Sequence, residues 1–140
     1  MPDMFELLEK CPLEVKAELC AAFRLFWSDQ AASAGRVRVS LERLMDHYGI
    51  LKRRKNRKGK YYDLTLNDRI KEFSKAEPTA EERIMALKWL GNTGSHKRDV
   101  SPDDLLDGFE VLEYFIAEFL DKRSARVAKL ARRLISKHAR

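Results

Sequence analysis

Apolar residues recur at helical spacing along most of this chain. Two series follow steps of four, three and four residues, which place their members on one face of a helix. The first series is Val15, Leu19, Ala22 and Phe26, and the second is Val37, Leu41, Leu44 and Tyr48. The spacing predicts helices over residues 13–29 and 31–48, with Gly49 placed to end the second one in a left-handed conformation.

Three later helix starts are marked by capping residues. Thr65 with Asp68 and Thr79 with Glu82 fit the capping box, in which a hydroxyl and a carboxyl side chain satisfy the first backbone N–H groups of a helix. At the third start, Ser101 is followed by Pro102 at the first helical position and by an acidic residue near the positive end of the helix dipole. These signals predict helices over residues 66–75, 80–91 and 102–121.

The predicted elements make an all-α fold. Only the stretch from Tyr61 to Leu66 alternates like a strand, so we expect a single helical bundle of about five main helices with little or no β-structure. At 140 residues the chain fits one domain, with a helical core over residues 13–121 and a basic tail over 122–140. The predicted core residues are Phe23, Phe26, Trp27, Leu41, Leu44, Leu87, Leu90, Leu112, Ile116 and Phe119.

Charge is strongly segregated in the sequence, although the formal net charge is only +6. Residues 52–60 carry seven basic and no acidic residues, and residues 122–140 carry eight basic and no acidic residues. The rest of the chain holds 13 basic and 22 acidic residues, a formal charge of −9. We expect an acidic body with an exposed basic loop and a basic amphipathic tail helix. Such dense basic runs contact nucleic-acid phosphates, or are simply solvated surface.

Other classes of function lack their sequence signals. The N-terminus has no signal-peptide pattern and no segment is long and apolar enough to span a membrane, which predicts a cytoplasmic protein without membrane contact. Cys11 and Cys20 form no pair with metal-ligand spacing, so neither zinc nor a disulfide framework is indicated. No glycine motif for nucleotides is present, and the pattern calls for no metal or cofactor.

The segment from Lys88 to His96 reads KWLGNTGSH and is the most specific short pattern in the chain. An imidazole in a polar turn between helices can carry a proton or contact a phosphate. Equally, Gly91 can end a helix in the left-handed conformation, with Asn92 and His96 bonding loose backbone groups. Both interpretations stay open on the sequence.

These residues carry a family resemblance. The chain resembles a bacterial domain of unknown function in the order of three features. These are an apolar helix, then Leu90-Gly91-Asn92-x-x-x-His96, then Ser101-Pro102-x-Asp104 before a long apolar helix. That domain occurs alone or at the ends of restriction-type proteins and is similar to the HEPN superfamily of helical bundles. The likeness also includes the Arg- and Leu-Glu-containing segment from Ala31 to Met45, and it covers roughly residues 13–121.

The resemblance implies a candidate ribonuclease site. Catalytic HEPN proteins are metal-independent ribonucleases with an Arg four to six residues before a His, assembled across a dimer. Here His96 matches the His and Asn92 a polar motif position, but the Arg is absent, and Lys88 and Arg83 are the nearest cations. Lysine does not replace a guanidinium that grips phosphate through two parallel hydrogen bonds. Whether the chain is an enzyme is therefore left open.

The leading hypothesis is a noncatalytic HEPN-like module that binds nucleic acid, RNA or DNA, or a nucleoprotein partner, in restriction or antiviral defence. Tyr61 and Tyr62 would stack on bases or pack as ordinary aromatics. The alternatives are a ribonuclease using His96, or a protein-interaction or homodimerisation module. The expected nucleic-acid-binding residues are Lys52, Arg53, Arg54, Lys55, Arg57, Lys58 and Lys60 in the loop, and Arg126, Lys129, Arg132 and Arg133 in the tail.

Overall fold

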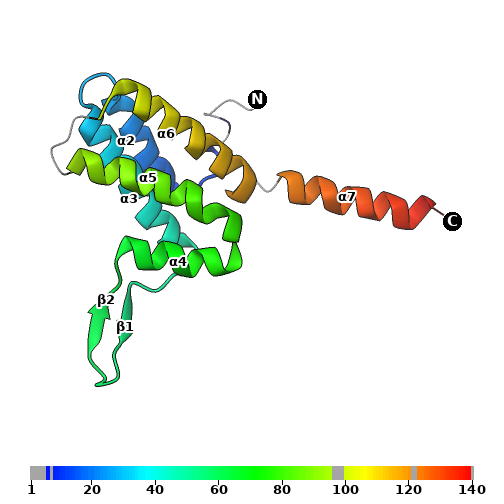
Figure 1. Cartoon of the computed structure of the whole chain (residues 1–140). Coiled ribbons are helices and arrows are strands. Elements are labelled where there is room, and N and C mark those ends of the chain that lie inside the picture. The colour runs from blue at the N-terminus through cyan, green and yellow to red at the C-terminus, as the bar shows by residue number, and fades with distance from the viewer. Residues whose placement is uncertain (1–5, 7, 96–99, 121–122, 140) are drawn as a thin grey trace.

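Among the described residues, the five helices α2 to α6 form the body of the molecule, which confirms the all-α prediction (Figure 1). The computed structural model describes residues 6, 8–95, 100–120 and 123–139, without the side chains of 92–95 and 123–124. The helices are α2 (Leu13–Leu25), α3 (Gln30–His47), α4 (Leu66–Ala76), α5 (Glu81–Ser95) and α6 (Pro102–Phe115). A 3₁₀ turn, η1 (Pro78–Ala80), precedes α5, and a π-helical turn, η2 (Ile116–Leu120), continues α6.

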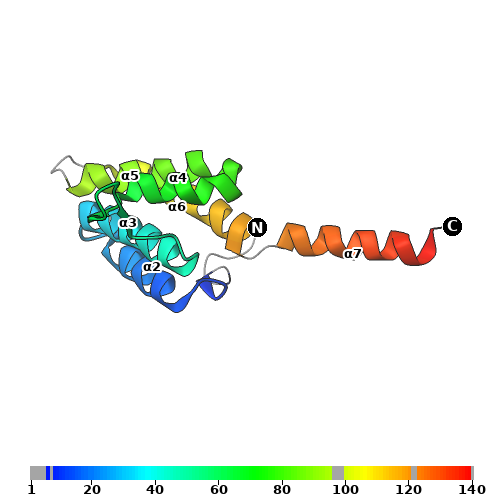
Figure 2. The same cartoon turned by 90° about the horizontal axis from the view of Figure 1, so that it is seen from below.

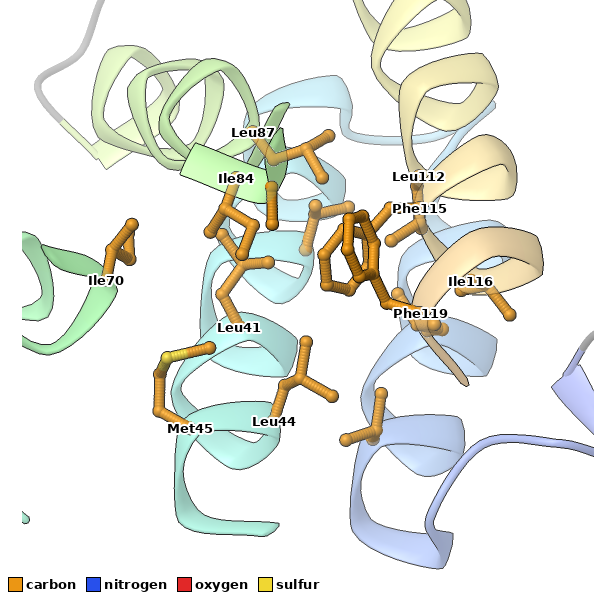
Figure 3. Packing of buried hydrophobic residues seen from close by; sticks show 14 of the residues in the cluster. Leu41, Leu44, Met45, Ile70, Ile84, Leu87, Leu112, Phe115, Ile116 and Phe119 are labelled. Atoms are coloured by element: carbon orange, nitrogen blue, oxygen red, sulfur yellow. The ribbon is translucent and has the colours of Figure 1, made fainter. Parts of the chain in front are cut away.

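The core lies around α3, which packs mainly between α2 and α5. Figure 3 shows side chains of α3, α4, α5, α6 and η2 meeting in this core, among them Leu41, Ile84 and Phe115. A second, smaller cluster closes the opposite end of the bundle around Phe26 and Leu105. Most of the predicted core residues are buried: Phe26, Leu41, Leu44, Leu87, Leu112, Ile116 and Phe119.

Helix capping follows the sequence at two of the three predicted starts. Thr65 and Asp68 form both hydrogen bonds of a capping box at α4, and the Ser101 hydroxyl accepts from the Asp104 N–H at α6. The prediction that Thr79 caps α5 is wrong, because Thr79 is the middle residue of the 3₁₀ turn η1 and α5 begins only at Glu81. Pro78 at the start of that turn favours this geometry, since its ring fixes a helical φ. At α3 an unpredicted cap is present, in which the Asp29 carboxylate accepts from the Ala32 N–H.

The end of α2 corrects part of the predicted core. The helix ends at Leu25, four residues earlier than predicted, and the chain turns through residues 26–28. This turn carries Trp27 away from the apolar face, and its side chain is 87% exposed. Phe23 and Leu90 are only partly buried, packed against the edges of the two clusters.

Helix α5 also departs from the prediction, because it continues through Gly91 to Ser95. Gly91 is buried where α5 crosses α3, and a Cβ placed on it would lie 2.5 Å from the Arg38 Cβ and 3.0 Å from the Ala34 carbonyl oxygen. The glycine therefore permits close contact between two helices and does not end one. By contrast Gly49 has a φ of +73° directly after α3 and its Tyr48 cap, as predicted.

The predicted basic loop is a β-hairpin. Strands β1 (Arg53–Lys55) and β2 (Tyr61–Asp63) pair antiparallel, with Arg54 opposite Tyr62. The hairpin projects from the body beside α4, as Figure 1 shows. The segment is largely exposed, as predicted, and β2 begins the strand-like stretch from Tyr61 to Leu66. Its pairing with β1 was not predicted, because two short strands give no long alternating pattern to detect.

The basic tail forms α7 (Arg123–His138), which extends away from the bundle in both Figure 1 and Figure 2. Every described side chain from residue 125 to 139 is exposed. The hairpin and α7 leave the body in different directions, so the two basic segments form two separate surfaces. Among the described residues, no helix has the length and apolarity needed to cross a membrane.

Candidate nucleic-acid interface

The turn of the hairpin is built around Asn56 and Gly59. The Asn56 side-chain oxygen accepts from the N–H groups of Lys58 and Lys60, at 2.9 and 3.0 Å. Gly59 has a φ of +77°, a conformation that costs glycine little, and its N–H donates to the Asn56 carbonyl. These bonds close a tight turn that holds three basic residues, Arg57, Lys58 and Lys60, at the distal end of the hairpin, which we call the tip.

Cations at the base of the hairpin have acidic partners, one within the hairpin and two on the body. Arg53 pairs with Asp63 at 3.0 Å and Arg54 with Glu72 of α4 at 2.5 Å, while Lys52 lies 3.6 Å from Asp46 of α3. The pKa of Glu72 is lowered by hydrogen bonds from Lys75 and from Arg54, and the same Glu72 bond raises the pKa of Arg54. Three of the seven predicted loop cations therefore already have acidic partners.

A buried arginine fixes the end of α3 next to the hairpin. The Arg69 side chain of α4 donates to the Asp46 carboxylate at 2.7 Å and to the Ile50 carbonyl at 2.9 Å. A buried guanidinium needs such partners, because leaving its charge unpaired would be costly. The hairpin thus starts from a well-anchored point rather than from a loose chain.

The tip differs from the base in having cations without acidic partners. Within the described part of the chain, Arg57, Lys58 and Lys60 are exposed and form no ion pair. Lys55 lies with its ammonium 5.1 Å from the centre of the Tyr61 ring. Tyr61 and Tyr62 are 65% and 47% exposed, so neither is part of the hydrophobic core. Cations and aromatic faces are together available to a ligand here.

Helix α7 presents the remaining predicted cations. Arg126, Lys129, Arg132 and Arg133 are all exposed and have no ion pair among the described residues. They share the helix with exposed apolar side chains, unlike the hairpin tip, where cations are mixed with tyrosines. The two basic surfaces therefore have different chemistry.

Of the four candidate ribonuclease residues, the structure describes the side chains of only Arg83 and Lys88, so the predicted site stays a prediction. Arg83 forms an ion pair with Glu118 of η2, and Lys88 is buried with its ammonium 4.3 Å from the centre of the Trp89 ring. Asn92 lies on the backbone of α5, in the stretch whose side chains are outside the description. His96 lies outside the described residues.

One arginine that contacts this segment was not among the predicted site residues. Arg38 of α3 packs its aliphatic stem against Gly91, the residue before Asn92. Its Nε is buried and has no hydrogen-bond partner among the described residues. Sequence spacing cannot find this contact, because the crossing of α3 and α5 brings Arg38 to Gly91 from more than fifty positions earlier in the chain.

The two cysteines carry no catalytic signal. Neither is in a disulfide, and burial raises the pKa of the Cys11 thiol to about 11. A thiol with a raised pKa is a poor nucleophile at neutral pH, because only the thiolate reacts. Cys11 borders a hollow at the end of the bundle together with His47, Tyr48 and Phe119.

A comparison with known families finds one family model whose matched range includes both basic surfaces. The model described as "Domain of unknown function (DUF4145)" matches residues 20–137. The chain belongs to this family. In this DUF4145 member the matched range includes the whole hairpin and nearly all of α7. No curated protein and no solved structure matches the chain. The similarity to HEPN bundles stays a prediction from the sequence.

Proposed function

We propose that this DUF4145 domain is a noncatalytic nucleic-acid-binding module, and that the hairpin tip contacts the phosphate backbone. The observation that carries the proposal is the contrast along the hairpin. Cations at the base are paired with acidic residues, whereas Arg57, Lys58 and Lys60 at the tip are exposed without such partners. Phosphate contacts by unpaired Lys and Arg supply most nonspecific affinity for nucleic acid.

The shape of the hairpin favours duplex DNA. A two-stranded antiparallel ribbon fits the major groove of B-form DNA, whereas the major groove of A-form RNA is too narrow for side chains to read. The acidic body disfavours broad contact, so a projecting element is suited to carry the positive charge away from it. The role in restriction or antiviral defence remains a prediction from the sequence resemblance.

Fluorescence anisotropy with labelled duplex DNA, duplex RNA and single strands at several salt concentrations tests the proposal. Arg57→Ala with Lys58→Ala should raise the Kd for duplex DNA about tenfold or more at 0.1 M salt, and should reduce the slope of log affinity against log salt by about 1.5 to 2. Both cations lie at the tip, away from the paired base, so the fold should be unaffected.

A charge-matched variant controls for long-range electrostatics. Lys10→Ala with Arg24→Ala removes the same charge from exposed positions of the body, and its affinity and salt slope should stay close to those of the unmodified chain. The proposal of phosphate contact at the tip would be refuted if both variants lost the same affinity, or if affinity did not depend on salt concentration. The protein-interaction hypothesis would then lead.

A further inference from the structure

Helix α7 has an apolar face that its own bundle does not cover. Val127, Leu130 and Leu134 follow one another at steps of three and four residues, and they are 56%, 48% and 58% exposed. Ile135, 64% exposed, widens this stripe, and Arg126, Lys129 and Arg133 run along its side. The helix sequence holds six basic and no acidic residues. An amphipathic helix without a partner usually binds its apolar face to another surface.

The bundle has a groove of complementary character between α5 and α6. Its hollow has a volume of about 300 Å³, with apolar walls formed mainly by Leu87, Trp89, Leu90 and Val111. Leu90 packs directly onto Gly108, where an added Cβ would overlap the Leu90 Cδ2, and Trp89 beside it is 60% exposed. Asp104 and Asp107 line the α6 side. Helix α6 as a whole carries five acidic and no basic residues.

The two surfaces are complementary in apolarity and charge. A helix presents a ridge of side chains, and a groove between two helices accepts such a ridge, as amphipathic peptides do in helix-in-groove complexes. The cations beside the α7 stripe would face the aspartates of the groove, which sets orientation and speeds encounter. Leu130 and Leu134 would replace water over Trp89 and Leu90.

We propose that α7 of one copy docks in the α5–α6 groove of a second copy of this chain, and that the exchange is reciprocal. Within one copy α7 leads away from the bundle, so its stripe and the groove do not meet (Figures 1 and 2). A two-fold axis would bring each helix onto the groove of the other copy and form two identical contacts, which closes the assembly at a dimer. This inference is independent of the nucleic-acid proposal.

Sedimentation of the full chain over a range of concentrations tests the dimer. The expected mass rises from 16.3 kDa toward twice that value with concentration. Leu130→Glu with Leu134→Glu should raise the dimer dissociation constant about 100-fold or more, because two apolar contacts become charges facing aspartates. Both residues are exposed in α7, so folding of the bundle is not at risk. The tip variant Arg57→Ala with Lys58→Ala should dimerise normally, which separates this result from the failure of nucleic-acid binding.

Charge reversal distinguishes exchange between copies from docking of α7 on its own bundle. Lys129→Glu with Arg133→Glu reverses the helix, and Asp104→Lys with Asp107→Lys reverses the groove. Each variant alone should be monomeric, whereas a mixture of the two should form a heterodimer, since each helix then meets a groove of opposite charge. A concentration-independent monomer for the unmodified chain would overturn the proposal. The proposal would also be overturned if the Leu130/Leu134 variant and the Lys129/Arg133 variant both dimerised as strongly as the unmodified chain. That outcome does not depend on whether the groove variant folds.

Discussion

At the scale of single residues, glycine plays two different roles in this chain. Gly49 allows the chain to leave α3 with a positive φ, and it was predicted because that signal is local. Gly91 allows α5 to lie close to α3, and its role depends on Arg38 and Ala34, which come from another helix. Local sequence therefore identifies the first kind of glycine, whereas for the second it only allowed a helix end that the structure does not have.

The helix crossing makes a prediction about Gly91. Gly91→Ala should lower the free energy of unfolding by about 1–3 kcal/mol, because the new Cβ would overlap the Arg38 stem and press on a carbonyl oxygen. Gly35→Ala is the matched control within α3, where a Cβ meets nothing within 4 Å. That control should gain about 0.4–1 kcal/mol, since alanine restricts the unfolded chain. Urea denaturation of both variants measures the difference, and a neutral Gly91→Ala would contradict the close crossing.

Cys11 makes a prediction about thiol chemistry. With its pKa raised to about 11 by burial, Cys11 should react with iodoacetamide at pH 8 about tenfold more slowly in the folded chain than in urea, after allowing for the greater nucleophilicity of a more basic thiolate. A Cys20→Ser background isolates its signal. Equal rates in the folded and unfolded chain would show that the thiol is not shielded.

The same pKa gives a pH dependence of stability with a defined sign. The folded state holds the Cys11 proton more tightly than the unfolded state, whose thiol has a value near 9.0. The contribution of this group is therefore fully present below pH 9 and is lost as pH rises through 11. Cys11→Ser should make the urea midpoint less sensitive to pH between 9 and 11. An unchanged dependence would assign that loss of stability to other groups.

At the scale of elements, the helices follow from local patterns and the hairpin does not. Apolar spacing predicted α2 and α3, and two capping motifs predicted the starts of α4 and α6 because each motif acts within four residues. The hairpin depends on pairing between strands five residues apart and on Asn56, whose side chain closes the turn. Exposed Trp27 was misassigned because the apolar spacing continues after α2 has ended.

Helix α6 and the π-helical turn η2 that continues it make a prediction that tests their shared apolar face. Leu112→Ala and Ile116→Ala each remove a side chain that is 3% or less exposed, and each should cost roughly 2–5 kcal/mol of unfolding free energy. Leu106→Ala, on the same helix but 52% exposed, should stay within about 0.5 kcal/mol of the parent. Thermal melts followed by circular dichroism provide the comparison, and similar losses at all three positions would reject the assigned face.

At the scale of the whole molecule, positive charge is carried by elements that project from an otherwise acidic bundle. The sequence could not predict which hairpin cations have acidic partners, because the partners Asp46 and Glu72 come from α3 and α4. The opposite charges of α7 and the α5–α6 groove also could not be predicted from the sequence, since the groove exists only after two helices pack. Sequence located the charges, and packing decided which ones have partners.

The bundle should therefore remain stable without α7. Deleting residues 122–140 removes no buried core residue among those described, since the core ends at Phe119. We expect the urea midpoint, measured at low protein concentration, to change by less than the equivalent of about 0.5 kcal/mol. A large loss would show that α7 supports its own bundle.

The exposed position of α7 has a practical consequence for handling the protein. Its six Lys and Arg residues within a solvent-exposed helix offer cleavage sites to trypsin-like proteases. Removing residues 122–140 takes away eight positive charges and turns the formal net charge from +6 to −2. The intact chain should bind a cation exchanger at neutral pH, while a clipped chain should pass through it and bind an anion exchanger. Column behaviour alone thus reports whether a preparation still carries its tail.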